Sequence, residues 1–255
     1  MTTTNTKPKL DIADKIATIT LRAPHVANRL SVDDLKEIQK HINHINQLES
    51  VLVLRLVAEG KYFSSGFDLK ALGQEVAPSI LLFAEVADAL ESARPITIAA
   101  IQGGVYGGGT DLCLACDFRI GTKDTNMFVP AAKLGLHFYP GGLRRYVNRV
   151  GLDNAKKILL LAEHFDAEEL YSMGFLTHLV ESEKLQEKTN ELSKDLSQMA
   201  PLALLPVKKH LNLIAHGDFR EEEIIERVKQ SEASDDMKEG VTAWAEKREP
   251  EFRGY

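Results

Sequence analysis

The sequence predicts an α/β fold whose strand–helix units give way to a helical C-terminal region. In the first half of the chain, the order strand, loop, helix, strand occurs twice, and each time a glycine-bearing turn follows the strand. From about residue 143 onward, hydrophobic positions recur mainly with helical spacing. With 44% hydrophobic residues in a chain of 255, there is enough apolar side chain to bury a full core, so we expect neither disorder nor a fibre.

Charge and apolar patterning limit the partners. The net charge of −6 gives no electrostatic footprint for nucleic acid or for an anionic membrane. Residues 1–9 contain no apolar signal core, and no later apolar run approaches the roughly 20 residues needed to cross a bilayer. We therefore expect a soluble, cytoplasmic protein that binds neither nucleic acid nor membrane.

The N-terminal segment is predicted to form a hairpin and then a helix. Hydrophobic residues alternate between 10 and 21 on either side of Asp14 and Lys15, which is typical of two short strands joined by a turn. Ser31 can cap a helix N-terminus, with Asp34 as the acidic third helical residue. Apolar residues with helical spacing follow, so we expect a helix of about four turns.

The remaining elements follow from the same patterns. Buried strands are predicted at 51–58 and 95–101, separated by a loop through 61–69 and a helix near 78–92. Further strands are predicted at 118–121, 127–130 and 175–180. Further helices are predicted at 143–150, 153–163, 167–173, 183–199, 202–215, 219–234 and 237–248. We divide the chain into a core of residues 1–196 and a helical region of residues 197–255.

A glycine-rich turn follows the strand at 95–101. It contains Gly103, Gly104, Gly107, Gly108 and Gly109 and leads into an apolar run that can form a helix. A strand, a glycine turn and a helix start leave N–H groups that can hold a developing negative charge, although such clusters are also common as plain tight turns. The stretch has neither the Walker pattern nor the dinucleotide pattern, so we do not expect it to bind nucleotide phosphate.

Two cysteines and one tryptophan have plain structural interpretations. Cys113 and Cys116 form a C-x-x-C without a second ligand pair or a thioredoxin-like context, so we expect buried small hydrophobic side chains, no metal site and a reducing compartment. Trp244 lies at helical spacing and is expected to pack in the core of the C-terminal helix.

Six segments together resemble the crotonase (enoyl-CoA hydratase/isomerase) superfamily, in register from about residue 10 to 252. They are Pro24-x-x-x-Asn28-x-Leu30, Phe63-Ser-Ser-Gly-Phe-Asp-Leu69, Gly107-Gly-Gly-Thr-Asp-Leu112 with Cys116-Asp117, the segment 130–135, Ala167-Glu-Glu-Leu-x-x-x-Gly174 and Glu239-Gly-Val-Thr-Ala-Trp-Ala-Glu-Lys-Arg-x-Pro250. The resemblance implies a spiral of β-β-α turns, followed by a helical region that packs on neighbours in a homotrimer or a hexamer, a dimer of trimers. It also implies an acyl-CoA substrate of the kind met in fatty acid metabolism, with no metal and no cofactor beyond its CoA moiety.

The resemblance also implies an oxyanion hole. In the family, two backbone N–H groups bind the thioester carbonyl oxygen, and the matching residues here are Phe67 and Gly108. As the thioester becomes an enolate, negative charge moves onto that oxygen, and donors fixed beforehand in a dry site stabilise it.

The acid/base positions depart from the family pattern. Hydratases of this family have two glutamates, whereas this chain has Asp111 at the first position and Ala131 at the second. Tyr139 falls where relatives with other chemistry place an aspartate, and His137 lies two positions earlier. A tyrosine can donate a hydrogen bond or a proton, and a histidine can titrate near neutral pH. Packing is the alternative role for Tyr139, a surface position for His137, and a helix-dipole acid for Asp111.

The resemblance places the CoA moiety against main chain near the first turn and against basic residues. Lys247 is expected to come from a neighbouring subunit, and an ordinary solvated charge is the alternative for each basic residue. The expected CoA contacts are Arg22, Ser65, Asp68, Leu69, Lys70 and Lys247.

Three functions remain open from the sequence. The first is an acyl-CoA enzyme of the hydratase/isomerase kind. The second is decarboxylation of a malonyl-type acyl-CoA with Tyr139 or His137 as the proton donor. The third is a non-catalytic CoA-binding or assembly protein, which the missing acid at Ala131 motivates and the intact glycine turns oppose.

Overall fold

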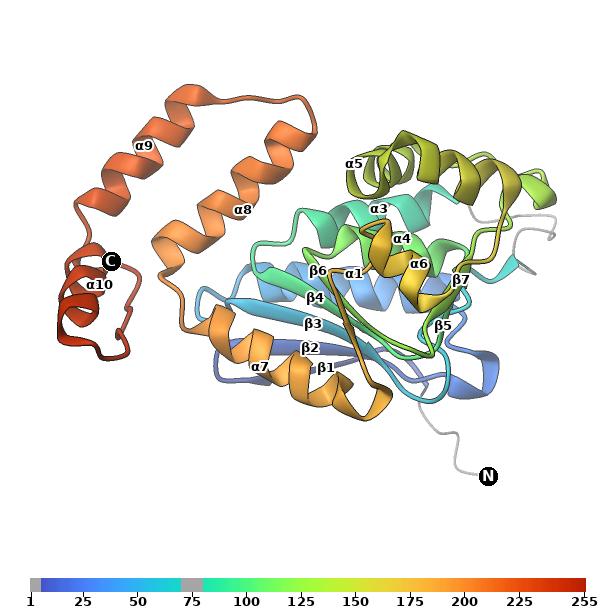
Figure 1. Ribbon diagram of the computed structural model, residues 1–255, viewed down its shortest axis with the longest axis horizontal. Helices are drawn as coiled ribbons and strands as arrows, with labels where there is room; N and C mark the ends of the chain where they lie inside the picture. Colours follow the sequence, from blue (N-terminus) through green and yellow to red (C-terminus); the bar gives the residue numbers. More distant parts are fainter. Residues whose placement is uncertain (1–5, 70–79) are drawn as a thin grey trace.

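The computed structural model describes residues 6–69 and 80–255. Its centre is a six-stranded sheet in the order β1-β2-β3-β4-β6-β8 (Figure 1). These strands are β1 (Lys9–Ala13), β2 (Ile16–Leu21), β3 (Val53–Ala58), β4 (Ile96–Ile101), β6 (Phe118–Thr122) and β8 (His178–Val180). The β1–β2 pair is antiparallel, and every other neighbouring pair in this sheet is parallel. A second, two-stranded sheet pairs β5 (Gly104–Tyr106) with β7 (Asn126–Phe128).

Helices follow most strands and dominate the C-terminal half. The longer ones are α1 (Val32–Asn46), α3 (Leu81–Glu91), α4 (Gly108–Ala115), α5 (Pro140–Lys156), α6 (Ala167–Ser172), α7 (Leu185–Ser197), α8 (Pro201–Ala215), α9 (Glu221–Glu232) and α10 (Asp235–Glu246). The short ones are η1 (Pro24–Val26), η2 (Ala132–Leu134), the π-helix η3 (Lys157–Leu161) and η4 (Ser182–Lys184).

The predicted hairpin and first helix are confirmed. Asp14 closes the β1–β2 turn with a positive φ of 52°, a conformation that aspartate tolerates better than most residues. Ser31 accepts a hydrogen bond from the Asp34 amide, and the Asp34 carboxylate accepts one from the Ser31 amide. This reciprocal capping box satisfies two donors that a bare helix end would leave exposed.

Each face of the large sheet carries its own hydrophobic core. Alternate residues of β4 point to opposite faces: Ile96 and Ile98 belong to the cluster that includes Leu196 of α7, whereas Ala99 and Ile101 belong to the larger cluster under α1, α3 and α4. Figure 1 shows α7 on one face and these three helices on the other. Both faces are therefore covered, as a mostly parallel sheet requires.

The expected spiral of β-β-α turns is present. Each turn contributes one strand to the large sheet, then a short extended segment, then a helix. The short segments stack on one another, because Leu30 bridges to Phe67, Ser64 bridges to Val105, and β5 pairs with β7. This stacking places the two glycine-bearing turns side by side.

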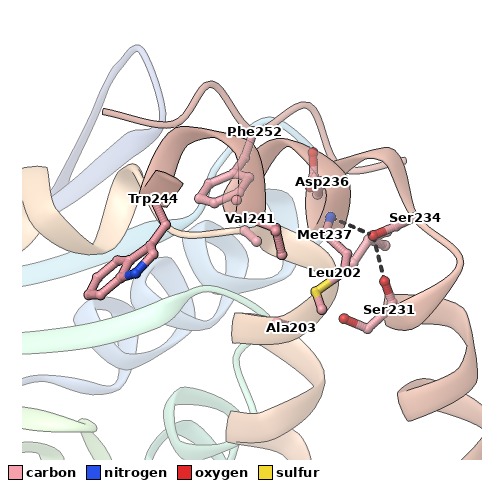
Figure 2. Close-up of a pocket in the computed structure, with 11 residues that line it drawn as sticks. Leu202, Ala203, Ser231, Ser234, Asp236, Met237, Val241, Trp244 and Phe252 are labelled. Atoms are coloured by element: carbon pink, nitrogen blue, oxygen red, sulfur yellow. Dashed lines mark hydrogen bonds between the residues drawn. The ribbon is translucent and has the colours of Figure 1, made fainter. Parts of the chain in front are cut away.

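The C-terminal helices α8, α9 and α10 extend beyond the sheet in Figure 1 and expose much apolar side chain. Trp244 on α10 is 87% exposed, so the expectation that it packs in a core is wrong for the single chain. It lies at the edge of a pocket of about 410 Å³ between α8 and α10, with its indole turned away from α10 (Figure 2). Other exposed apolar residues of this region are Val207, Leu211, Phe219, Val228 and Val241.

A few element bounds differ from the expectation. The short strand β5 falls inside the glycine stretch that we read as a turn, and β8 begins at His178 rather than at residue 175. Phe175 and Leu176 are buried in the connection that precedes β8, which explains their strand-like apolar character. The two helices predicted at 143–150 and 153–163 form α5 and the π-helix η3. The division of the chain near residue 197 stays a prediction.

None of the helices in the described ranges combines the length and apolar character that crossing a bilayer requires. Within the same ranges, no three His, Cys, Asp or Glu side chains gather into a group that could hold a metal ion.

Candidate functional site

The first turn is anchored by a buried asparagine. Asn28 adopts a left-handed conformation with φ of 50°, and its side-chain amide donates to the carbonyls of Glu59 and Tyr62, at 2.8 Å each. Its side-chain oxygen accepts from the Ala23 amide at 2.8 Å, and its own carbonyl accepts from the Ser64 hydroxyl at 2.9 Å. The 24–30 motif therefore fixes the loop that carries residues 63–67.

Gly66 brings this turn against the second one. Its φ is 83°, and a Cβ built on it would lie 2.8 Å from the Gly108 nitrogen and 2.8 Å from the Tyr106 carbonyl oxygen. Real Cβ atoms do not approach backbone so closely, so a side chain at Gly66 would push the turns apart. Leu30 donates to the Gly66 carbonyl at 2.8 Å, which holds the turn from its other side.

The second turn links β5 to α4. The Tyr106 amide donates to the Ser64 carbonyl at 2.8 Å, and the Gly107 amide donates to the Phe128 carbonyl at 3.1 Å. Gly108 then opens α4, where a Cβ would lie 2.7 Å from the ring of Phe83. Both turns thus depend on glycine for close approach rather than for flexibility alone.

The backbone amides of Phe67 and Gly108 lie at this junction. In the described part of the chain, neither the Phe67 N–H nor the Gly108 N–H donates a hydrogen bond to another residue. Gly108 is the first residue of α4, where helix geometry leaves the N–H without an internal partner. The Phe67 side chain is buried and meets the ring of Phe83 edge to face, with centroids 6.3 Å apart. The junction therefore offers main-chain donors beside an apolar wall.

Asp111 lies one helical turn after Gly108, on the same face of α4. It is fully buried. Arg145 grips both carboxylate oxygens, with Nε donating to Oδ1 at 2.9 Å and Nη2 donating to Oδ2 at 2.7 Å. The hydroxyl of Tyr139 also donates to Oδ2, at 2.6 Å. The structure thus joins two of the predicted acid/base residues by a direct hydrogen bond, and it adds an arginine on Asp111 that sequence reasoning did not single out.

Arg145 is itself held by acids from another helix. Its Nη1 donates to Asp88 Oδ1 at 2.7 Å and to Glu91 Oε2 at 2.9 Å, both on α3. Burial by itself would lower the pKa of Arg145, but the hydrogen bond and charge of Asp111, the hydrogen bond of Asp88 and the charge of Glu91 raise it above its usual value. The guanidinium therefore stays charged.

Tyr139 is fixed at the N-terminus of α5. It is the N-cap residue before Pro140, it is 4% exposed, and its ring stacks on Phe138 with centroids 5.1 Å apart. Burial, the charge of Asp111 and the hydrogen bond to it raise the pKa of Tyr139 well above its ordinary value. The phenol therefore stays protonated at any working pH.

A second hydroxyl pair reinforces the contact between α4 and α5. Thr110 and Tyr146 share a hydrogen bond, and both side chains are fully buried. Burial and the nearby charge of Asp111 raise the pKa of Tyr146. The position of α5, and with it Arg145, is thus locked to the helix that begins at Gly108.

The other two acid/base positions lie apart from this cluster. Ala131 precedes η2 and packs against the core without any polar side-chain atom. His137 is exposed, and its Nδ1 lies 2.6 Å from the carbonyl of the neighbouring Phe138. The structure brings Asp111 and Tyr139 together but leaves His137 at the surface.

The expected CoA contacts are dispersed around the first turn. Arg22 donates to the Lys7 carbonyl at 2.9 and 3.1 Å, and the Ser65 hydroxyl lies 3.4 Å from the Val26 carbonyl. Asp68 forms an ion pair with Arg29 at 3.5 Å. Leu69 is 46% exposed.

The two lysines among the expected CoA contacts are not found beside the site in the described part of the chain. Lys70 lies outside the described residues. Lys247 ends α10 with φ of 55°, and Figure 1 shows α10 far from β5 and the glycine turns. Within one chain Lys247 is therefore remote from the site, and only a neighbouring subunit would bring such a residue close.

The prediction that the two cysteines are buried side chains is confirmed. Cys113 and Cys116 are fully buried and free. Burial, aided by the charge of Asp117, raises the pKa of Cys116 to about 12, and burial also raises that of Cys113. Thiols that resist ionisation are poor nucleophiles and poor metal ligands.

Comparisons with known proteins find relatives over nearly the whole chain. The family described as enoyl-CoA hydratase/isomerase matches residues 11–255. The chain is 28% identical over 249 residues to a short-chain-enoyl-CoA hydratase of Clostridium acetobutylicum, covering 95% of each chain. It is 24% identical over 250 residues to a methylmalonyl-CoA decarboxylase of Escherichia coli, covering 95% of this chain and 96% of the relative. A crystal structure titled as an enoyl-CoA hydratase/carnithine racemase from Magnetospirillum magneticum superposes with a TM-score of 0.89 at 26% identity, covering 97% and 96% of the two chains.

Proposed function

Because this chain belongs to the enoyl-CoA hydratase/isomerase family, we propose that it processes an acyl-CoA thioester by stabilising its enolate between the amides of Phe67 and Gly108. The observation that carries the proposal is the pair of adjacent N–H groups without an acceptor in the described chain. A thioester oxygen bound there accepts both donors. Losing one such donor typically raises the barrier by about 3–4 kcal/mol. No cofactor beyond the CoA moiety of the substrate is needed for this step.

The acid/base groups decide which reaction the enolate serves. Hydration in this family uses two carboxylates, but Ala131 supplies none and Asp111 already accepts three hydrogen bonds from Arg145 and Tyr139. Neither of these two positions offers a free carboxylate to activate water or to remove an α-proton. This arrangement weighs against ordinary hydration and against the single-glutamate double-bond shift.

Decarboxylation of a malonyl-type acyl-CoA is the reaction that this geometry supports best. The bond between the α-carbon and the carboxylate breaks, carbon dioxide leaves, and the electron pair passes onto the thioester oxygen as an enolate. No general base is required, because the oxyanion hole alone lowers the barrier. The enolate carbon then takes a proton that derives from water. Tyr139 serves as a neutral hydroxyl that orients either the acyl group or the water molecule that supplies the proton. It is better placed for this role than His137, which is exposed.

A hydratase or isomerase activity remains the second candidate. Its support is the position of Asp111, one turn from Gly108 where hydratases carry their first glutamate, together with the Clostridium relative named as a hydratase. On our account such activity is weak.

Mass spectrometry of acyl-CoAs incubated with the protein in deuterated water tests these alternatives. We expect methylmalonyl-CoA or ethylmalonyl-CoA to lose 44 mass units and the product to gain one deuterium. A gain of water by crotonyl-CoA, with the malonyl-type compounds untouched, would reverse the ranking. No turnover of any compound, with CoA binding confirmed separately, would instead support a non-catalytic CoA-binding protein.

We also propose that α8, α9 and α10 form the contacts of a homotrimer or hexamer. The support is the exposure of apolar residues there, including Trp244 of α10 and Phe219 in the connection between α8 and α9. Light scattering coupled to size exclusion measures the mass directly. A mass three or six times that of the chain is expected, and a monomer at micromolar concentration would contradict the proposal.

A further inference from the structure

We propose that Arg145 is a positioning residue of this site. It binds the carboxylate of Asp111, and that carboxylate then holds the Tyr139 hydroxyl and takes no part in proton transfer. The role assigned to Tyr139 rests on the proposed function. Arg145 lies outside both the predicted site and the oxyanion hole, and it acts through the two side chains that it orders.

The hydrogen bonds around Asp111 leave little capacity for substrate. A carboxylate has about four acceptor sites. Arg145 occupies one on each oxygen, and Tyr139 occupies a second on Oδ2. Asp111 is fully buried, and its shorter side chain, compared with a glutamate, ends at the guanidinium. The acceptor sites of the Asp111 carboxylate are therefore occupied mainly by protein groups rather than by substrate.

The guanidinium cannot turn away from this arrangement. All three of its nitrogens donate hydrogen bonds, to acids on α3 as well as to Asp111 on α4. The Arg145 side chain is fully buried, and that of Glu91 is 8% exposed. A planar fork that bridges two helices fixes direction as well as charge, which a lysine at this position would not do.

The neighbouring Arg144 provides a matched control. It also donates to Glu91, at 2.9 Å, but its side chain is 35% exposed and no contact joins it to Asp111 or Tyr139 among the described residues. The two adjacent arginines thus share Glu91 as a partner, but of the two it is Arg145 that also binds Asp111. Their substitution separates a general effect of losing charge on α5 from the specific effect on Tyr139.

A double-mutant cycle between Arg145→Gln and Tyr139→Phe tests the proposal. In the wild-type background we expect Arg145→Gln to lower kcat about 30- to 100-fold while KM changes less than threefold. In the Tyr139→Phe background the same substitution should lower kcat by less than threefold, because the hydroxyl that Arg145 positions is gone. Arg144→Gln should stay within about twofold of wild type. Equal losses from Arg145→Gln in both backgrounds would overturn the proposal.

Two further variants protect the test from a trivial folding defect. Arg145→Gln leaves a buried acid without its cation, whereas the double variant Asp111→Asn/Arg145→Gln removes both charges and should fold. We expect this double variant to be no more active than Arg145→Gln. Arg145→Lys should recover less than a tenth of wild-type kcat, because it keeps the charge and loses the fork. Wild-type activity in either variant would overturn the proposal.

A measurement without substrate distinguishes failure of this inference from failure of the proposed function. With tyrosines labelled with ¹³C at Cζ, Tyr139 should give one sharp resonance in the wild type and in Arg144→Gln. Arg145→Gln should shift or broaden that resonance. An unchanged resonance would overturn the positioning role even if the enzyme decarboxylates its substrate, and a changed one would support it even if no substrate is found.

Discussion

Two regions of the molecule differ in how they satisfy their least compatible side chains. One is the block formed by α3, α4 and α5, and the other comprises the C-terminal helices α8 to α10. In the first, even the charged side chain of Arg145 is fully buried and all its nitrogens find partners in the same chain. In the second, Trp244 is 87% exposed, and Phe219 in the connection between α8 and α9 is 65% exposed. The charged cluster around Arg145 thus finds its partners within one chain, whereas the second region presents apolar surface that we propose another copy covers. Chemistry and assembly should therefore be separable by mutation.

The largest expected effect comes from closing the space between the two turns. Gly66→Ala places a Cβ 2.8 Å from the Gly108 nitrogen in a conformation with φ of 83°, so the two amides must move. We expect kcat to fall by 10³ or more, while the oligomeric mass is unchanged.

Gly135→Ala is the control for that substitution. Gly135 also has a positive φ, of 70°, but nothing lies within 4 Å of its Cβ position. It should cost only about 1 kcal/mol of unfolding free energy from backbone strain, with kcat within a few-fold of wild type. Equal loss of activity in both variants would show that strain, rather than the junction, matters.

The complementary change affects the exposed helices alone. Trp244→Ser should weaken self-association about 10- to 100-fold, because buried tryptophans dominate many interfaces, and it should leave the far-ultraviolet circular dichroism unchanged. Lys238→Ser on the same helix is the control and should not shift the mass. Concentration-dependent light scattering measures both. An unchanged mass for Trp244→Ser would remove the distinction between the two regions.

The smallest effect is the contribution of the buried Cys116 thiol to the pH dependence of stability. Burial raises the pKa of Cys116 from 9.0 to about 12, so the unfolded chain ionises first as pH rises above about 9. Stability that is fully present at neutral pH is therefore lost toward pH 12. At pH 10 this group alone should cost about 1.4 kcal/mol of unfolding free energy. Urea denaturation at pH 7 and pH 10 should show a smaller difference in unfolding free energy for Cys116→Ala than for the wild type. Equal differences would contradict this prediction.

Local patterns predicted most of the fold. The capping box at Ser31 and Asp34, the hairpin at Asp14 and the buried cysteines all follow from residue type and spacing. The glycine-rich stretch after the strand at 95–101 was predicted as a turn, but β5 within it was not, because a three-residue strand containing Gly104 has too little alternation to recognise. Trp244 was misplaced because helical spacing indicates a buried face without saying whether the same chain or another one covers it.

The candidate site was only partly predictable. The resemblance to the family predicted roles for Asp111 and Tyr139, but their mutual hydrogen bond depends on how α4 meets α5 in space. The sequence does not distinguish Arg144 from Arg145, because one residue of helical rotation decides which side chain is buried. Asp88 and Glu91 lie more than 50 residues before Arg145, so no local pattern marks their contact with it.

The most direct test of the central claim is infrared spectroscopy of acetyl-CoA labelled with ¹³C at its carbonyl, bound to the protein. If the amides of Phe67 and Gly108 grip the thioester oxygen, the labelled carbonyl stretch should move to lower frequency on binding, and Gly66→Ala should abolish that shift. A carbonyl stretch that stays at its solution frequency while the CoA moiety is bound would contradict the account.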